Sequence, residues 1–80
     1  MATLLYADGR KEDVTPKNGS DFTLEELQGF VGGYIDIVSA RNNRILVVDD
    51  EGLYKEASLN LNATNAAGMI IVGDALLCEK

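Results

Sequence analysis

A short apolar run followed by a mostly polar run opens the chain and predicts a pair of strands. Thr3 to Tyr6 favours extended structure, and Asp8-Gly9 follows it directly. Asp-Gly between two extended runs is typical of a type I′ hairpin turn, in which both central residues have positive φ. The returning run, Arg10 to Thr15, carries few apolar residues, so we expect it to lie at a sheet edge. Pro16 ends this strand, because proline has no N–H to donate.

A helix is predicted next, because apolar residues recur at helical spacing between two clear end signals. Thr23 suits the N-cap, and Glu26 three residues later completes a capping box. One face of this helix is apolar and is expected to be buried; it consists of Leu24, Leu27, Phe30 and Val31. Gly32 and Gly33 end the helix, because one of them can take the left-handed conformation that a Cβ disfavours. The sequence leaves open which glycine does so.

Two further apolar runs predict a second hairpin. The strands are Tyr34 to Val38 and Arg44 to Val48, and Ser39 to Asn43 forms the turn between them. Another turn follows at Asp49 to Gly52, where we expect Gly52 to supply a backbone angle that other residues disfavour.

The last third of the chain predicts a short helix and a final apolar stretch. The segment Leu53 to Leu61 fits a helix and a strand about equally well. Asn62 suits the N-cap of the short helix, and Gly68 suits its end. Within the stretch Met69 to Cys78, Gly73-Asp74 either turns a tight hairpin or forms a bulge in one strand buried on both faces.

These elements follow the order β-β-α-β-β-α-β, which is typical of one α+β domain over residues 1–80. We expect a small, mainly antiparallel sheet with two short helices packed on one face. A chain of 80 residues buries a modest core, and such domains usually gain support from disulfides, metals or self-association. Cys78 is the single cysteine and histidine is absent, which excludes an intrachain disulfide and argues against a structural zinc site. We therefore expect a homo-oligomer.

Charge and composition narrow the class of partner. Acidic residues number 13 against 7 basic ones, a net charge of −6. Binding to the nucleic-acid backbone needs clustered lysine and arginine, so nucleic acid is not an expected partner. The apolar runs are too short to span a membrane, and the N-terminus lacks the regions of a signal peptide. A cytoplasmic location is expected, in keeping with an unpaired thiol.

Four segments resemble a known family in their order and spacing. They are FTLEELQGFVGGYIDIV, DDEG, LNLNAT and IVGDALL, at residues 22–38, 49–52, 59–64 and 71–77. Together they resemble a small domain-of-unknown-function family carried by bacteriophages, plasmids and other mobile elements, over nearly the whole chain. The resemblance implies a compact accessory protein of the bacterial host cytoplasm, with no activity established for the family. Accessory proteins of this kind often counter host defence, by sequestering a signalling nucleotide or by occluding a defence protein.

The side chains that enzymes commonly use are mostly missing. Histidine, the usual acid–base group at neutral pH, is absent, and Cys78 lies in an apolar segment where a thiol is inert. The glycine patterns of phosphate-binding loops are also absent. The acidic residues Asp49, Asp50, Glu51 and Asp74 lack the alternation of a calcium loop. We therefore expect neither catalytic residues nor a cofactor or metal site.

A small set of residues could bind a ligand. Asn62, Thr64 and Asn65 lie in NLNATN, where amide side chains can donate and accept at once, as recognition of a base edge requires. Tyr34 either packs on the sheet or stacks on a ligand. Arg44 is the base best placed to meet an anion. The competing interpretation is that Asn62 caps the helix and its neighbours complete turns.

Two functional hypotheses follow. In the first, a non-catalytic homo-oligomer sequesters a small ligand, such as a host immune-signalling nucleotide, between its subunits. In the second, an acidic protein-binding inhibitor occupies a host defence enzyme through its charged surface or through an open sheet edge.

Overall fold

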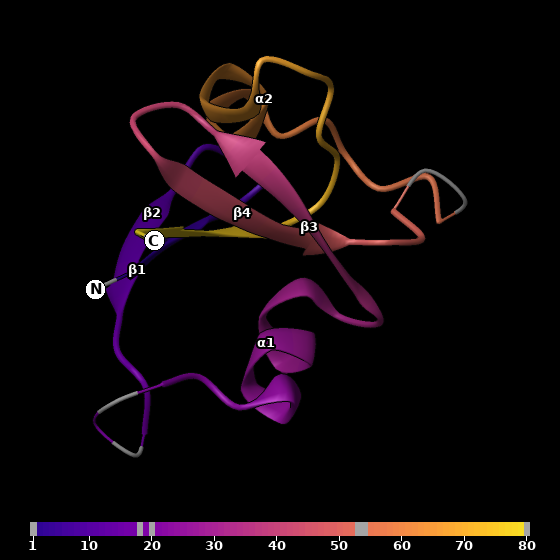
Figure 1. Cartoon of the computed structure of the whole chain (residues 1–80). Coiled ribbons are helices and arrows are strands. Elements are labelled where there is room, and N and C mark those ends of the chain that lie inside the picture. The colour runs from indigo at the N-terminus through magenta and orange to yellow at the C-terminus, as the bar shows by residue number, and fades with distance from the viewer. Residues whose placement is uncertain (1, 18, 20, 53–54, 80) are drawn as a thin grey trace.

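One sheet lies between two helices in the computed structural model, which describes residues 2–17, 19, 21–52 and 55–79 (Figure 1). The strands are β1 (Ala2–Leu5), β2 (Lys11–Val14), β3 (Ile35–Ala40), β4 (Arg44–Asp49) and β5 (Ala75–Glu79). The helices are α1 (Leu24–Val31) and α2 (Leu61–Ala67). The strand order is β2-β1-β5-β4-β3, and each neighbouring pair is antiparallel. The predicted α+β class and the predicted order of elements are confirmed.

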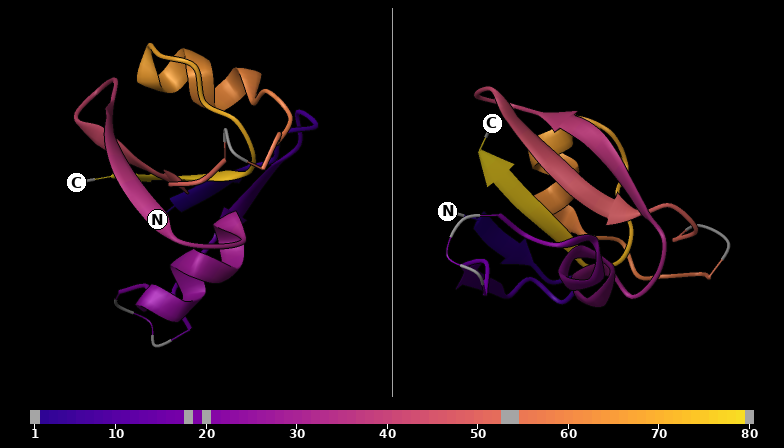
Figure 2. Two further views of the ribbon diagram at one scale, coloured as in Figure 1. Left: turned by 90° about the vertical axis from the view of Figure 1, so that its right-hand side faces the viewer. Right: turned by 60° about the horizontal axis from the view of Figure 1, so that its bottom comes forward.

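The two helices cover opposite faces of the sheet, so the prediction that both pack on one face is wrong (Figure 2). On the α1 face the buried cluster consists of Ala2, Leu4, Val31, Val47 and Leu76. On the α2 face it consists of Leu5, Leu46, Val48, Ala63, Ile71 and Ala75. Successive side chains of a strand point to opposite faces, so the unbroken apolar runs of β4 and β5 need cover on both sides.

The first hairpin is confirmed, but its turn differs from the prediction. Gly9 has φ of +97°, whereas Asp8 is not among the residues with positive φ, so a type I′ turn is wrong. The Gly9 N–H donates to the Tyr6 carbonyl at 3.0 Å, and the Tyr6 N–H donates to the Arg10 carbonyl at 2.9 Å. These bonds close a three-residue loop that needs one left-handed residue only. β2 lies at a sheet edge, as predicted.

Helix α1 begins at the predicted capping box. The Thr23 hydroxyl accepts from the Glu26 N–H at 3.2 Å, and the Glu26 carboxylate accepts from the Thr23 N–H at 3.1 Å. Gly32 takes the left-handed conformation, with φ of +88°, and its N–H donates to the Gln28 carbonyl. The buried face is narrower than predicted, because Leu24 in the first turn is 58% exposed.

Two other glycines are explained by close contacts. A Cβ on Gly33 would lie 2.6 Å from the Lys55 Nζ, and a Cβ on Gly52 would lie 2.9 Å from the Val72 Cγ2. Neither glycine has positive φ, so the prediction of a special backbone angle at Gly52 is wrong. The absent side chain matters most at Gly52, where Val72 and the backbone occupy its place; at Gly33 the neighbour is the end of a flexible lysine side chain, which a Cβ would displace.

Helix α2 begins two residues earlier than predicted, because its N-cap is Asn60 and not Asn62. Asn60 is fully buried, and its Oδ1 accepts from the Ala63 N–H at 3.0 Å. Its Nδ2 donates to the carbonyls of Leu5 and Gly73, each at 2.8 Å. A buried amide needs such partners, and this one joins the start of α2 to two distant segments.

The segments on either side of α2 form a narrow ribbon. Leu59 bridges Val72, and β5 begins only at Ala75, so Gly73-Asp74 is neither a hairpin nor a bulge within a strand. Residues 55–58 form turns and irregular structure, and Leu53 and Tyr54 lie outside the described residues. Among the described residues, neither helix is long and apolar enough to cross a lipid bilayer.

Candidate functional site

The structure does not gather the five predicted ligand-binding residues into one site. Tyr34 and Arg44 stand at opposite ends of the β3–β4 hairpin, since Tyr34 precedes β3 and Arg44 pairs with the last residue of β3. The Arg44 Nε donates to the Arg41 carbonyl at 3.2 Å, beside the β3–β4 turn. Asn62, Thr64 and Asn65 belong to α2.

Two of the predicted residues in α2 make contacts within the chain. The Thr64 hydroxyl accepts from the Ile71 N–H at 2.9 Å and lies 3.3 Å from the Ile71 carbonyl, to which it donates. The Asn62 Nδ2 donates to the Gly9 carbonyl at 3.4 Å. Asn65 is exposed on the same helix. The polar segment NLNATN therefore mainly attaches α2 to its surroundings.

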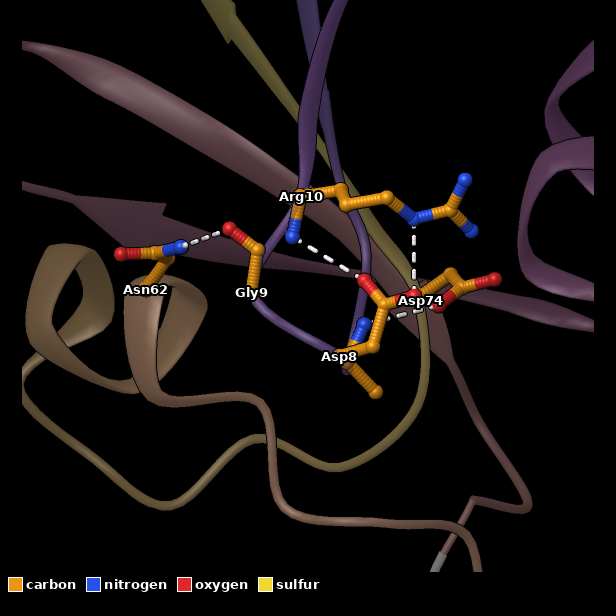
Figure 3. A network of polar contacts seen from close by, with 6 residues as sticks. Asp8, Gly9, Arg10, Asn62 and Asp74 are labelled. Atoms are coloured by element: carbon orange, nitrogen blue, oxygen red, sulfur yellow. Dashed lines mark hydrogen bonds and ion pairs between the residues drawn. The ribbon is translucent and has the colours of Figure 1, made fainter.

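The β1–β2 loop carries a polar network that Figure 3 shows from close by. The Arg10 Nε lies 2.7 Å from the Asp8 carboxylate, and the guanidinium stands 4.5 Å above the centre of the Tyr6 ring. The backbone N–H of Arg10, and then its guanidinium, lower the pKa of Asp8. The Asp74 carboxylate accepts from the Ala7 N–H at 2.9 Å. This network fixes the loop and connects it to the segment before β5.

The acidic turn after β4 is held by internal contacts. The Asp49 carboxylate accepts from the Glu51 N–H at 2.9 Å and lies 3.1 Å from the Lys55 Nζ. Within the described part of the chain, no group of three or more carboxylate or thiol side chains is placed to hold a metal ion. Burial raises the pKa of the Cys78 thiol, which disfavours the reactive thiolate.

Lys55 caps the C-terminal end of α1, and its ammonium group lies where a Gly33 side chain would be. Its Nζ lies 3.3 Å from the Gly32 carbonyl, where the helix dipole favours a positive charge. Beside this contact lies a hollow of about 450 Å³, and its lining includes Gly29, Gly33 and Tyr34. The side chain of Tyr34 is 68% exposed there. This corner can accept a planar group against the tyrosine ring.

A second hollow, of about 790 Å³, lies between the end of β2 and α1, with Val14, Thr23 and Phe30 in its lining. Its polar side chains include Glu26, whose carboxylate already accepts from the Thr23 and Lys17 N–H groups. These bonds lower the pKa of Glu26. The Thr23 and Glu26 side chains in this hollow therefore serve the helix start.

Strand β3 has a neighbour on one side only, because it ends the strand order. The Asp50 N–H donates to the Tyr34 carbonyl at 3.0 Å, which marks Tyr34 and Asp50 as a hydrogen-bonded pair in the register of β3 and β4. Such pairs alternate along antiparallel strands. The N–H and C=O groups of Ile35, Ile37 and Ser39 therefore point away from β4, towards the open edge.

One of these outward groups is occupied by a neighbouring side chain. The Ile37 N–H donates to the Asp36 carboxylate at 2.9 Å. A carboxylate in this position takes the place that the carbonyl of an added strand would use. Charged side chains at sheet edges are a known means of preventing unwanted strand pairing.

Large apolar side chains are exposed on both sides of this edge. Ile37 is 55% exposed and lies on the α1 face, because it stands opposite Val47. On the α2 face, Met69 and Ile70 are 54% and 71% exposed. They help line a groove of about 160 Å³ together with Asp36 and other residues. We name Tyr34, Asp36, Ile37, Met69 and Ile70 the β3 edge site.

Of the residues of this candidate site, the sequence analysis singles out Tyr34 and not the other four. Two signals were present in the sequence. Asp36 interrupts an apolar strand, and Met69-Ile70 follows directly after Gly68, where a loop would ordinarily be polar. Neither signal shows which strand stands at an edge of the sheet.

Comparison with known proteins places the chain in a family. No curated protein and no solved structure matches it. A family model described as "Domain of unknown function (DUF3846)" matches residues 2–80, nearly the full length that carries the two helices and five strands. The match includes every residue of the β3 edge site. The chain therefore belongs to the DUF3846 family of domains of unknown function.

Proposed function

We propose that the protein is a non-catalytic binding protein that captures an extended segment of a protein partner at the β3 edge site. The observation that carries this proposal is an open strand edge flanked by exposed Ile37, Met69 and Ile70. An extended segment that pairs with β3 would continue the sheet, with affinity from main-chain hydrogen bonds and selectivity from its alternating side chains.

The exposed apolar surface supports this function. Single exposed apolar side chains are common in soluble proteins and need no explanation. Here they lie on both sides of one strand, where an added strand would cover them together.

The resemblance to proteins of mobile elements supplies a biological setting for the proposal. In a bacterial host cytoplasm, the partner would be a host defence protein, and occupation of its extended segment would inhibit it. The net charge of −6 favours a basic partner, because complementary charge speeds association and excludes acidic competitors.

Capture of a small nucleotide-type ligand by a homo-oligomer is a second candidate, favoured by the hollow beside Tyr34. Its lining combines the exposed ring of Tyr34, on which a base can stack, with the side chain of Lys55, which can meet a phosphate. Two such hollows joined across subunits would enclose the ligand. This candidate predicts a discrete oligomer in light scattering and a melting temperature that rises with one nucleotide of a panel.

Site-specific photocrosslinking tests the principal proposal. A benzophenone amino acid replaces Ile37 at the β3 edge or, as a matched control, Glu12 at the β2 edge, in the cells that produce the protein. We expect one partner to be crosslinked from position 37 and not from position 12. With that partner purified, hydrogen exchange at the amides of Ile35, Ile37 and Ser39 should slow on binding. Equal crosslinking from both positions, or unchanged exchange, would contradict the proposal.

A further inference from the structure

The Asp36 carboxylate can have one hydrogen-bond or charge partner in the free protein and another when a strand pairs with β3. In the free protein it accepts from the Ile37 N–H at 2.9 Å. Any strand that pairs with β3 needs this N–H for its own carbonyl. The carboxylate must then turn away, and the groove on the α2 face is the space beside it, because Asp36 stands opposite Val48 and helps line that groove.

The groove is acidic on one wall and apolar on the other. Asp36 and Asp50 are exposed residues of the first wall, and Met69 and Ile70 belong to the second. Neither Asp36 nor Asp50 forms an ion pair with another described residue, whereas Asp49 is paired with Lys55. A strand laid along β3 would cover the Asp36 carboxylate between its own side chains and Met69. A covered carboxylate without a cation is unfavourable, so the incoming strand has to supply one.

We propose that β3 selects an extended segment of a partner protein in which a lysine or arginine is flanked on the same face by apolar residues, and that Asp36 is the selecting residue. The inference rests on the proposed function. When the segment binds, the Asp36 carboxylate releases the Ile37 N–H and pairs with the partner's cation. The flanking apolar side chains contact Met69 and Ile70.

The β3 strand of a second copy fits the site poorly. β3 reads Ile-Asp-Ile-Val-Ser-Ala and carries no basic residue. In pairing of β3 with itself, each displaced Asp36 carboxylate would therefore have no cation from the facing strand. Each copy also has a net charge of −6, which opposes self-association through an acidic groove. Charge complementarity therefore favours a foreign basic strand.

Three capped peptides test the inference with the full chain. They are TVVKVVT and the same sequence with glutamate or leucine in place of lysine, so that the central side chain and two valines share one face. Amide chemical shifts of Ile35, Ile37 and Ser39 report binding. We expect the lysine peptide to bind about tenfold more tightly than the glutamate and leucine peptides, because only it supplies a charge partner.

Variants of Asp36 separate selection from mere edge pairing. Asp36→Asn keeps an acceptor for the Ile37 N–H and should abolish the preference for lysine, and Asp36→Lys should prefer the glutamate peptide. Glu12→Gln removes one negative charge, as Asp36→Asn does, but from β2 at the other edge of the sheet, and it should keep the preference for lysine. Equal binding of the three peptides overturns the inference while leaving edge capture intact. Failure of all three to bind at millimolar concentration also overturns it, and the photocrosslinking result still decides the proposed function independently.

Discussion

The two edges of the sheet differ in how they are protected. β2 begins with Lys11, Glu12 and Asp13, which are all exposed, and Thr3 on the neighbouring strand donates to the Asp13 carboxylate at 3.3 Å. β3 has one charged residue, Asp36, among apolar and small neighbours. Charges of both signs make β2 a poor partner for any added strand. The single carboxylate of β3 can turn away from the Ile37 N–H when a partner supplies a cation. This edge is therefore protected against strands that carry no cation and open to those that do.

The largest expected effect concerns the free energy of unfolding and the buried residue Asn60, which joins the start of α2 to Leu5 and Gly73. Asn60→Ala should lower the free energy of unfolding by about 2–4 kcal/mol, because it leaves the carbonyls of Leu5 and Gly73 without their buried donor. Asn62→Ala is the matched control and should cost about 0.5 kcal/mol or less, as expected for a partly exposed side chain. Urea denaturation followed by circular dichroism measures both. Equal losses would contradict the assignment of Asn60 as the N-cap.

A smaller effect concerns the corner that leads from α1 into β3. The methyl group of Gly33→Ala would lie 2.6 Å from the Lys55 Nζ. The substitution should therefore displace the ammonium group from Asp49 and from the Gly32 carbonyl. In a Lys55→Ala background the same change should stabilise the protein by about 0.4–1 kcal/mol, because it restricts the unfolded chain. A double-mutant cycle should therefore give a coupling of about 1 kcal/mol between the two positions. Additive effects would show that the contact does not constrain Gly33.

The smallest expected effect is a pH-dependent contribution to stability from Glu26, which connects the start of α1 to Lys17, after β2. Backbone N–H groups of Thr23 and Lys17 lower the folded-state pKa of Glu26 below its ordinary value of 4.5. The unfolded state therefore binds the proton more readily, so this stabilisation is fully present above pH 4.5 and is lost as the pH falls through the folded pKa. Melting temperatures of the native protein and of Glu26→Gln should thus converge on acidification. A difference in melting temperature that does not shrink as the pH falls below 4.5 would contradict this assignment.

Local signals in the sequence predicted local structure well. Thr23 and Glu26 form the capping box that their spacing indicates, because its bonds join residues only three apart. The sequence predicts Asn62 as the N-cap of α2, whereas the structure has Asn60 there. The partners that distinguish Asn60, the carbonyls of Leu5 and Gly73, are distant in sequence and leave no local signal. The placement of the helices on opposite faces also depends on long-range packing.

The candidate site was harder to predict than the fold. Tyr34 is a candidate by residue type, because a tyrosine ring can stack on a ligand, although the sequence leaves open whether it packs on the sheet instead. Asp36 has a distinctive position only because β3 ends the strand order, and that order joins β1 to β5 across the whole chain. Thr64 was a reasonable ligand candidate by type, yet Ile71 already satisfies its hydroxyl.

The central position of β5 has a consequence for biosynthesis. β5 pairs with β1 on one side and with β4 on the other, so it alone joins the two hairpins into one sheet. During synthesis both hairpins leave the ribosome before β5 does, and until then the inner edges of β1 and β4 have no partner strand. Pairing across the middle of the sheet must then wait for β5, and a nascent chain stalled before Ala75 would leave the inner edges of β1 and β4 unpaired.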